Sequence, residues 1–246
     1  MKLQYLGDSR DAFKWDLLHW LSTRSEPAFA RLLFIPLLTP DDPVPRDGRT
    51  PHAWFPCRPL IRPFVAGLAT GPRSLARIVA LGALEPDYPL DVTVAQARTF
   101  VEAGARRGSY WDWCHPELYA NTLVFLDPDN GFETRTQHGP KWVRHDEVKW
   151  LLERLPESSA VAVYQHRPRR RWEDLFADLG TRLDYPPHAQ AVYEANLAFL
   201  LLSRTRGAAE RLARAAKRYC EGKAVVRALT IGSREGVDRL EVDSRT

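Results

Sequence analysis

The chain has 246 residues, of which 44% are hydrophobic and 27% charged, and its formal net charge is +4 at pH 7. This length and apolar content suit one sizeable α/β domain, and the mild positive charge permits a polyanionic partner such as RNA or DNA. The sequence has no run of about 18 apolar residues and no secretory signal pattern, so we expect a soluble, cytoplasmic protein without a membrane partner.

The first predicted helix lies in GDSRDAFKWDLLHWLSTRS, with Asp8 as its N-terminal cap and Asp11 in its first turn. Apolar side chains at helical spacing predict its inward face: Phe13, Leu17, Trp20 and Leu21. The apolar run ARLLFIPLL at 30–38 then predicts a strand covered on both sides. Residues 40–59 contain six prolines and predict a long loop.

Two further helices are expected at 72–83 and 93–106, the second beginning at Thr93. The aromatic segment SYWDWCHPELY follows, which favours core packing over a base-stacking platform. TLVFLD at 122–127 and SAVAVYQH at 159–166 are predicted as buried strands. They flank a helix at 146–155 that Asp146 would cap.

The last third predicts a different pairing of strands. A helix near 170–182 precedes two apolar runs, 189–195 and 197–205, which are too close together for a crossover helix and therefore predict an antiparallel hairpin. A long helix at 207–223 and an edge strand at 225–231 complete the chain. The basic face of that helix is expected to be solvated: Arg211, Arg214, Lys217 and Arg218.

Together these elements predict one α/β domain over residues 1–246, with a loop and helical insertion at 40–121. Its mostly parallel sheet would carry helices on both faces and end in the antiparallel hairpin. Polar residues follow three of the strands, at 39–42, 127–131 and 165–167. They are also ordinary turn residues, but the carboxyl edge of a parallel sheet is where ligands bind, so we expect a site there.

Two of these segments resemble a known family. YLGDSRDAFKWDLLHWL is similar to the opening motif of the bacterial large-subunit ribosomal RNA adenine-N6 methyltransferases, and LVFLDPDNGFE falls where that family carries Asp-Pro-Pro-Tyr. The motifs YLGDS, FK, DLL, LDPDNG and YQH also resemble a sparsely characterised family of bacterial and phage proteins. The order of elements at 159–222 is similar to the Rossmann-like class I methyltransferase fold.

The methyltransferase resemblance implies a protein that acts on nucleic acid with S-adenosylmethionine, by N6-adenine methylation. The catalytic residues would be Asp127, Asn130 and His166. Residues lining the cofactor pocket would be Gly7, Asp8, Lys14 and Thr39.

The sequence departs from that family at two places. Asp129-Asn130 replaces Pro-Tyr, so Phe132 or Trp111 would have to supply the aromatic ring that stacks on a base. The turn after the first strand reads FIPLLTPDDP, without the glycines that let a backbone approach a cofactor.

Two other function classes stay open. In a metal-dependent nuclease, Asp127 and Asp129 would bind Mg²⁺, and three nearby groups would stabilise charge or transfer protons: Lys14, Lys141 and His166. Further ligands would come from Asp41, Asp42 or Glu133. The third class is a non-catalytic module that binds nucleic acid or protein. The three widely spaced cysteines, without a CxxC pair, indicate neither a disulfide framework nor a structural zinc site.

A basic cluster follows the strand that ends at His166. It comprises Arg167, Arg169, Arg170 and Arg171. Such a cluster where a strand passes into a helix can hold the phosphates of a nucleic acid, or it can be a solvated turn.

Overall fold

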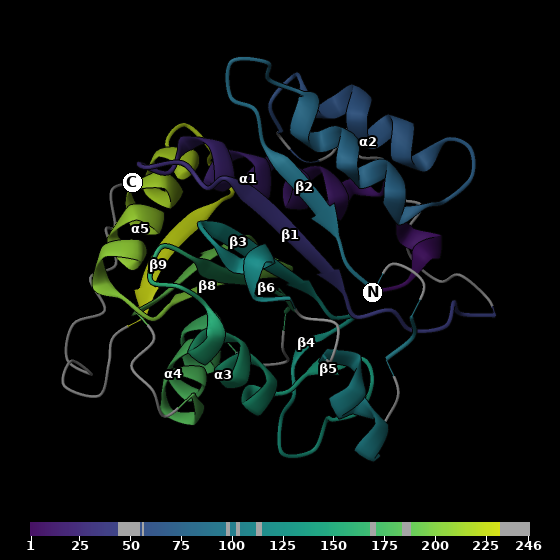
Figure 1. The fold of residues 1–246 in the computed structure, drawn as a ribbon, viewed down its shortest axis with the longest axis vertical. Coiled ribbons are helices and arrows are strands. Elements are labelled where there is room, and N and C mark those ends of the chain that lie inside the picture. The colour runs from purple at the N-terminus through teal and green to yellow at the C-terminus, as the bar shows by residue number, and fades with distance from the viewer. Residues whose placement is uncertain are drawn as a thin grey trace.

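The computed structural model describes residues 1–43, 55, 57–96, 99–101, 104–111, 115–167, 171–183 and 188–231. Their centre is a seven-stranded sheet with the strand order β2-β1-β3-β6-β8-β7-β9 (Figure 1). The strands are β1 (Arg31–Pro36), β2 (Asp91–Val94), β3 (Thr122–Asp127), β6 (Ala160–His166), β7 (His188–Tyr193), β8 (Leu197–Ser203) and β9 (Arg227–Ile231).

The strands β2, β1, β3 and β6 are parallel neighbours, and Pro36 of β1 pairs with Asp127 of β3. Their carboxyl ends therefore meet at one edge of the sheet, where the N-terminus also lies (Figure 1). β8 pairs antiparallel with both β6 and β7, which confirms the predicted hairpin. β9 adds the predicted edge strand, antiparallel to β7.

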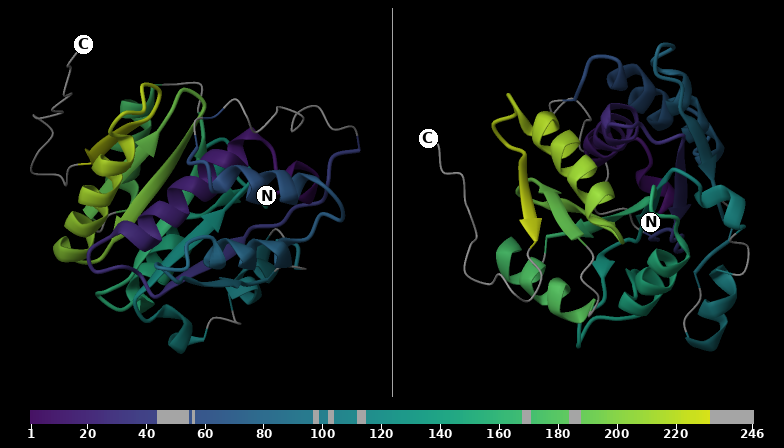
Figure 2. Two further views of the ribbon diagram at one scale, coloured as in Figure 1. Left: turned by 90° about the horizontal axis from the view of Figure 1, so that it is seen from above. Right: turned by 60° about the vertical axis from the view of Figure 1, so that its left-hand side comes forward.

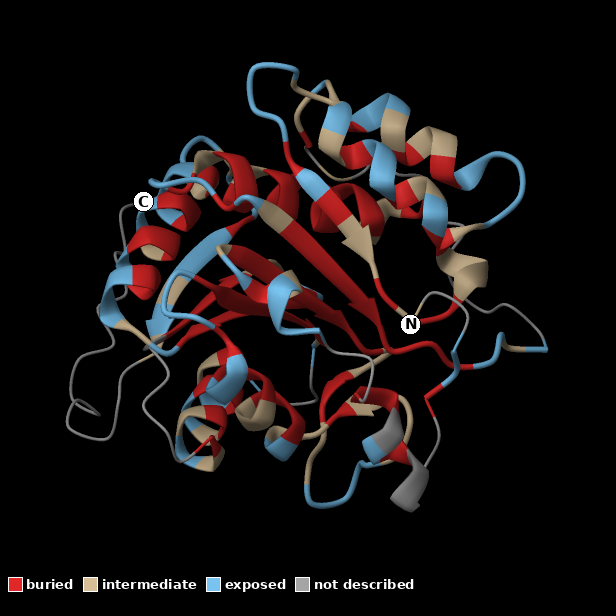
Figure 3. Cartoon of the chain, viewed as in Figure 1, coloured by how far each residue is buried: buried red, intermediate tan, exposed pale blue. Residues whose placement is uncertain are grey.

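Helices cover both faces of this sheet (Figures 1 and 2). One face carries α1 (Ser9–Arg24), α2 (Ile61–Ala69) and α5 (Arg206–Cys220), and the other carries α3 (His145–Arg154) and α4 (Trp172–Arg182). Because alternate side chains of a strand point to opposite faces, Leu32 and Phe34 of β1 join the first layer, whereas Leu33 and Ile35 join the second. The central strands β1, β3, β6 and β8 are consequently buried except at Arg31 and His166 (Figure 3).

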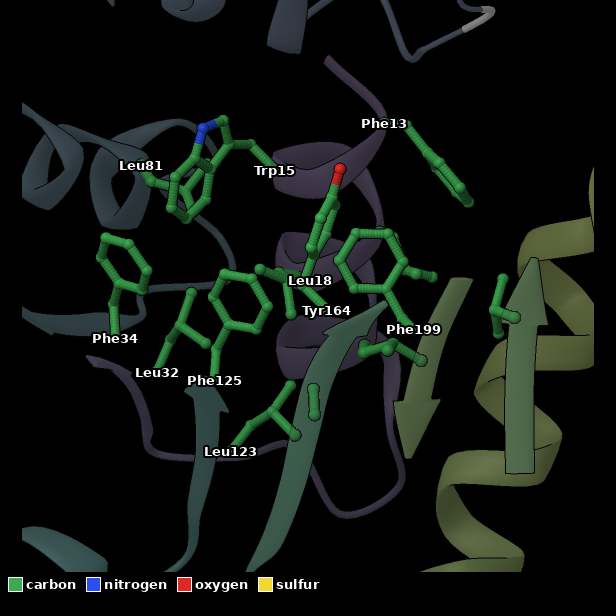
Figure 4. Close-up of a cluster of buried hydrophobic side chains, with 14 of the residues drawn as sticks. Phe13, Trp15, Leu18, Leu32, Phe34, Leu81, Leu123, Phe125, Tyr164 and Phe199 are labelled. Carbon is green, nitrogen blue, oxygen red and sulfur yellow. The ribbon is translucent and has the colours of Figure 1, made fainter. Parts of the chain in front are cut away.

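Aromatic rings hold α1 against the sheet (Figure 4). Trp15 meets Phe34 edge-to-face, with ring centroids 5.2 Å apart, and Phe34 stacks on Phe125 at 5.4 Å. Such pairs add about 0.5–1.5 kcal/mol each beyond the burial of their area. The neighbouring Lys14 is thereby fixed at the end of β3.

Several predicted elements differ from the observed ones. The helix expected at 93–106 is wrong, because Asp91–Val94 form β2 and pair with β1 in parallel. The β-branched residues of this short segment, Val92, Thr93 and Val94, pack well in an extended chain. The insertion at 40–121 therefore contributes a strand to the main sheet, as well as α2, which the sequence analysis did not predict.

Smaller corrections concern helix type and ends. The helix expected at 72–83 is a 3₁₀ helix over Leu75–Ala83, and α3 begins at His145 with Arg144 as its cap, so Asp146 lies in the first turn. Arg211 of α5 is buried rather than solvated, and its guanidinium donates to the carbonyl oxygens of Pro27 and Ser158. Short elements complete the fold: 3₁₀ helices at Leu3–Tyr5, Gly104–Trp111 and Pro116–Tyr119, and a pair of two-residue strands, β4 (Gly131–Phe132) and β5 (Trp142–Val143).

Across the described ranges, no helix combines the length and apolar character needed to cross a membrane. The two cysteines within these ranges, Cys57 and Cys220, are both free thiols.

Candidate functional site

A cavity of about 350 Å³ lies at the carboxyl edge of the sheet. Its walls come from the N-terminal segment, the start of α1, the loop after β3 and the end of β6. This is the place where ligands bind in open parallel sheets, and the volume is within the range of small-molecule sites.

The turn into α1 places two carboxylates at the cavity. Asp8 caps the helix, because its Oδ1 accepts hydrogen bonds from the backbone N–H groups of Arg10 and Asp11 at 2.9 and 3.0 Å. The backbone N–H of Gly7 donates to Asp11 Oδ2 at 2.7 Å. Gly7 has a φ of +90°, and a Cβ there would strike the backbone of Ala69, so only glycine fits this turn.

Lys14 forms a buried cluster with two carboxylates. Its Nζ lies 2.8 Å from Asp11 Oδ1 and 2.8 Å from Asp127 Oδ2. Burial alone would lower the pKa of Lys14, but Asp11 and Asp127 together raise it above its ordinary value, so the ammonium stays charged. Burial raises the pKa of Asp127, and Lys14 opposes that rise.

Asp129 is held by the N-terminal segment and by the turn that follows β1. The amino group of Met1 lies 2.6 Å from Asp129 Oδ1, and the hydroxyl of Thr39 donates to Asp129 Oδ2. The backbone N–H of Thr39 in turn donates to the carbonyl oxygen of Met1 at 2.9 Å. Thr39 is buried behind these contacts and does not line the cavity.

The loop Pro128–Gly131 is fixed by Gln165 of β6. Gln165 Nε2 donates to the carbonyl oxygen of Asn130 at 3.2 Å, and Gln165 Oε1 accepts from the backbone N–H of Phe132 at 2.8 Å. Gly131 has a φ of +107°, and a Cβ on it would collide with the Gln165 side chain. The backbone of Asn130 is thus fully engaged, whereas its side-chain amide lines the cavity without a partner among the described residues.

Three titratable groups line the cavity near Lys14. Burial and the neighbouring Asp11 raise the pKa of Asp8 to about 6. Burial and the positive charge of Arg10 lower the pKa of His166 to about 4, so this imidazole is neutral at pH 7. His166 Nε2 lies 3.3 Å from the hydroxyl of Tyr164, whose ring is 5.3 Å from Lys14 Nζ.

Two cations of the lining have no carboxylate partner within the described part of the chain. They are Arg10 and Lys141, and both are half-buried. Lys2, by contrast, is paired with Asp42. Arg10 and Lys141 are therefore available to an anionic group of a ligand.

The basic cluster after β6 is only partly described. Arg167 is exposed and directly follows His166, while Arg169 and Arg170 lie outside the described residues. Arg171 is exposed, approaches Asp174 at 3.5 Å and does not line the cavity.

The structure brings half of the predicted site residues that it describes together at this cavity. Those that line the cavity are Asp8, Lys14, Asp42, Asp127, Asp129, Asn130, Lys141 and His166. Those that do not are Gly7, Thr39, Asp41, Trp111, Phe132, Glu133, Arg167 and Arg171. Sequence reasoning did not assign seven of the lining residues to the site. Five of them lie inside a quoted motif, namely Tyr5, Arg10, Asp11, Pro128 and Tyr164, and the other two are Met1 and Lys2.

The two aromatic residues that could have supplied a stacking ring, Trp111 and Phe132, do not line the cavity. Trp111 is buried and its indole N–H donates to Glu147 Oε1 at 3.2 Å, and Phe132 packs against His145. The aromatic side chains that line the cavity are instead Tyr5, Tyr164 and the imidazole of His166.

The turn after β1 does not fit S-adenosylmethionine in the manner that the methyltransferase resemblance implies. The backbone N–H groups of Leu37 and Thr39 donate to the carbonyl oxygens of Asp127 and Met1, at 3.2 and 2.9 Å. A cofactor bound against this turn would have to displace those contacts.

A magnesium site of the proposed kind does not fit either. The carboxylates of Asp127 and Asp129 face separate cations, Lys14 and the amino group of Met1. No three His, Cys, Asp or Glu side chains are grouped so as to hold a metal ion, wherever the side chains are described.

Comparison with known protein-family models gives no match for this chain, and a search of curated proteins finds no relative.

Proposed function

We propose that the protein binds a nucleic-acid strand and places one nucleotide in this cavity. The observation that carries the proposal is the presence of two cations, Arg10 and Lys141, without carboxylate partners beside the unpartnered amide of Asn130. A ligand that satisfies them must combine an anionic group with a polar, hydrogen-bonding group, as a nucleotide does.

The partial exposure of the two cations supports the same ligand. Arg10 and Lys141 are half-buried, so the phosphates of a strand bound to them would remain in contact with solvent. Asn130 can bond a base edge, and the rings of Tyr5 and Tyr164 offer apolar surface to a base. Arg167, exposed directly after His166, adds positive charge for the neighbouring phosphates.

The proposal includes neither methyl transfer nor metal-dependent cleavage. In the adenine-methyltransferase reading, the Asp127 carboxylate would accept a base amino group, yet this carboxylate is engaged by Lys14. Calorimetric titration with S-adenosylmethionine, with and without RNA or DNA, tests whether the protein binds this cofactor. Saturable heat would favour the methyltransferase hypothesis again.

Binding of fluorescein-labelled RNA and DNA strands, measured by anisotropy over a range of salt concentrations, tests the proposal. Arg10→Ala/Lys141→Ala should weaken binding at least about tenfold and should reduce the slope of log K against log salt by about 1.4, since each phosphate contact on a single strand contributes about 0.7.

The matched control is Arg206→Ala/Lys217→Ala, which removes the same charge from exposed positions of α5. Arg206 follows the carboxyl end of the antiparallel strand β8 and so lies at the opposite edge of the sheet. This control should bind as the unaltered protein does. Equal losses in the two double variants, or no salt-dependent binding of any strand, would defeat the proposal.

A further inference from the structure

We infer that the ring of Phe100 stacks on a base of the bound strand outside the cavity, so that the binding surface continues along this edge of the sheet. The inference rests on the proposed binding of a nucleic-acid strand. It concerns a second contact of that strand, and it can fail while binding in the cavity is upheld.

Phe100 presents an apolar ring to solvent. Within the described ranges, four large apolar side chains are exposed, namely Val79, Tyr88, Phe100 and Val225, and Phe100 is 52% exposed. Single exposed apolar side chains are common on protein surfaces, so the place of this ring has to carry the argument. A phenylalanine ring has no polar atom, and its free face can therefore only make apolar or stacking contacts.

The backbone of Phe100 is fixed to the turn that follows β1. Phe100 forms a parallel β-bridge with Leu38, and the backbone N–H of Val101 donates to the carbonyl oxygen of Leu38 at 2.9 Å. Leu38 comes two residues after the last residue of β1, Pro36, whose neighbour in the sheet is the end of β3. Phe100 therefore lies at the carboxyl edge, where the cavity is.

The same turn contacts the wall of the cavity on its other side. The backbone N–H of Thr39 donates to the carbonyl oxygen of Met1 at 2.9 Å, and the Thr39 hydroxyl donates to Asp129. Met1 and Asp129 both line the cavity. The carbonyl group of Leu38 and the N–H of Thr39 belong to one trans peptide and point in opposite directions, so Phe100 and Met1 flank the turn.

These contacts give the separation of the ring from the cavity. Neighbouring extended segments lie about 4.8 Å apart, and two such spacings place the backbone of Phe100 roughly 10 Å from that of Met1. A strand with one nucleotide in the cavity covers this distance within its next few nucleotides when it runs toward β1. A single nucleotide in the cavity does not reach Phe100.

Phe100 also faces the side of the sheet on which the cavity is built. Alternate residues of an extended chain point to opposite faces. Leu38 packs in the first layer, with α1, whereas Val101 packs in the second. Phe100 is the bridge partner of Leu38 and precedes Val101, so it faces the first layer, to which the cavity residue Tyr164 also belongs.

A base is the part of the strand that suits this ring. Every base has an apolar face that stacks on an aromatic side chain, and such a contact adds affinity with little sequence preference. Phosphates are served by the two cations of the cavity, Arg10 and Lys141. The strand would thus be held by its phosphates at the cavity and by a base at Phe100.

Anisotropy of a fluorescein-labelled oligouridine or oligothymidine of about 12 nucleotides, within the usual site sizes of single-strand binders, tests the contact. Phe100→Ala should weaken binding at least about fivefold, the lower end of the usual effect of losing one base stack. The slope of log K against log salt should not change, because no phosphate contact is removed. Phe100→Trp should bind at least as tightly as the unaltered protein, since an indole also stacks on bases.

Two controls isolate the stacking contact. Tyr88→Ala removes a ring that is 46% exposed, and Tyr88 lies shortly before β2 begins at Asp91, which is the opposite edge of the sheet. This variant should bind as the unaltered protein does. A strand of the same length and charge without bases should bind Phe100→Ala and the unaltered protein equally.

Each outcome separates the two claims. Unchanged binding of Phe100→Ala, an equal loss with the strand that lacks bases, or an equal loss in Phe100→Trp or Tyr88→Ala would overturn the stacking contact while leaving binding in the cavity in place. Failure of the unaltered protein to bind any strand would overturn the proposed function as well.

Discussion

Replacing Asp8 with asparagine should make the folded protein more stable at neutral and alkaline pH, although Asp8 caps α1. Burial and Asp11 raise the pKa of Asp8 from 3.8 to about 6, so the folded state disfavours the ionised carboxylate. A rise of this size corresponds to about 3 kcal/mol. Asparagine removes that cost and keeps the cap, but it loses about 1 kcal/mol of interaction with the helix dipole, which leaves a gain of about 2 kcal/mol.

The pH dependence of this gain identifies its cause. Because the folded-state pKa is raised, the cost of the ionised Asp8 is absent below pH 3.8 and fully present above about pH 6. Stability of the unaltered protein should therefore fall relative to Asp8→Asn as the pH rises through this window. Urea unfolding at about pH 4, 5, 6 and 8 measures the difference.

The control is Asp146→Asn, an exposed aspartate in the first turn of α3. It should change the free energy of unfolding by less than about 0.5 kcal/mol, as surface substitutions usually do. If Asp8→Asn destabilises the protein at pH 8, or if its effect is the same at every pH, the cost assigned to burial of the ionised Asp8 carboxylate is refuted.

Two other substitutions probe how the cavity is held. Lys14→Met should lower the free energy of unfolding by about 3–5 kcal/mol at pH 7.5, because it leaves two buried carboxylates without their cation. Urea unfolding should show part of this loss recovered as the pH falls, because burial already raises the pKa of Asp127 and its carboxyl then takes up a proton more readily; a loss below about 1 kcal/mol in the free energy of unfolding would contradict the cluster. Gly131→Ala should lower the free energy of unfolding by about 2–4 kcal/mol, because φ is positive at this position and the new Cβ would displace the hydrogen bonds of Gln165. Thermal or urea unfolding measures the change, and an unchanged stability would contradict the conformation of this loop.

Hydrophobic patterning was sufficient to predict the central strands and the hairpin. β1, β3, β6 and β8 are long apolar runs that can only be buried, and the short gap before Leu197 leaves no room for a crossover helix. β2 was missed because four residues, of which only Val92 is buried, give a weak signal, and Thr93 there can equally cap a helix. Pairing with β1 makes this segment a strand rather than a helix, and β1 is distant from it in the sequence.

The site was predictable where it follows the strands directly, as at Asp127 and His166. The partner of Asp127 could not be derived from local pattern, because Lys14 precedes it by 113 residues and reaches it only when α1 packs on the sheet. The role of Thr39 also depends on a distant contact, since it bonds Asp129 and lies behind the cavity wall.

Photochemical crosslinking locates the bound nucleotide most directly. A single-stranded RNA that carries photoreactive 5-bromouridine is irradiated with the protein, and the modified peptides are identified by mass spectrometry. We predict adducts on the cavity aromatics Tyr5, Tyr164 or His166, and their loss in Arg10→Ala/Lys141→Ala. Adducts confined to peptides of α3 or α5, which do not line the cavity, would contradict nucleotide binding at this edge of the sheet.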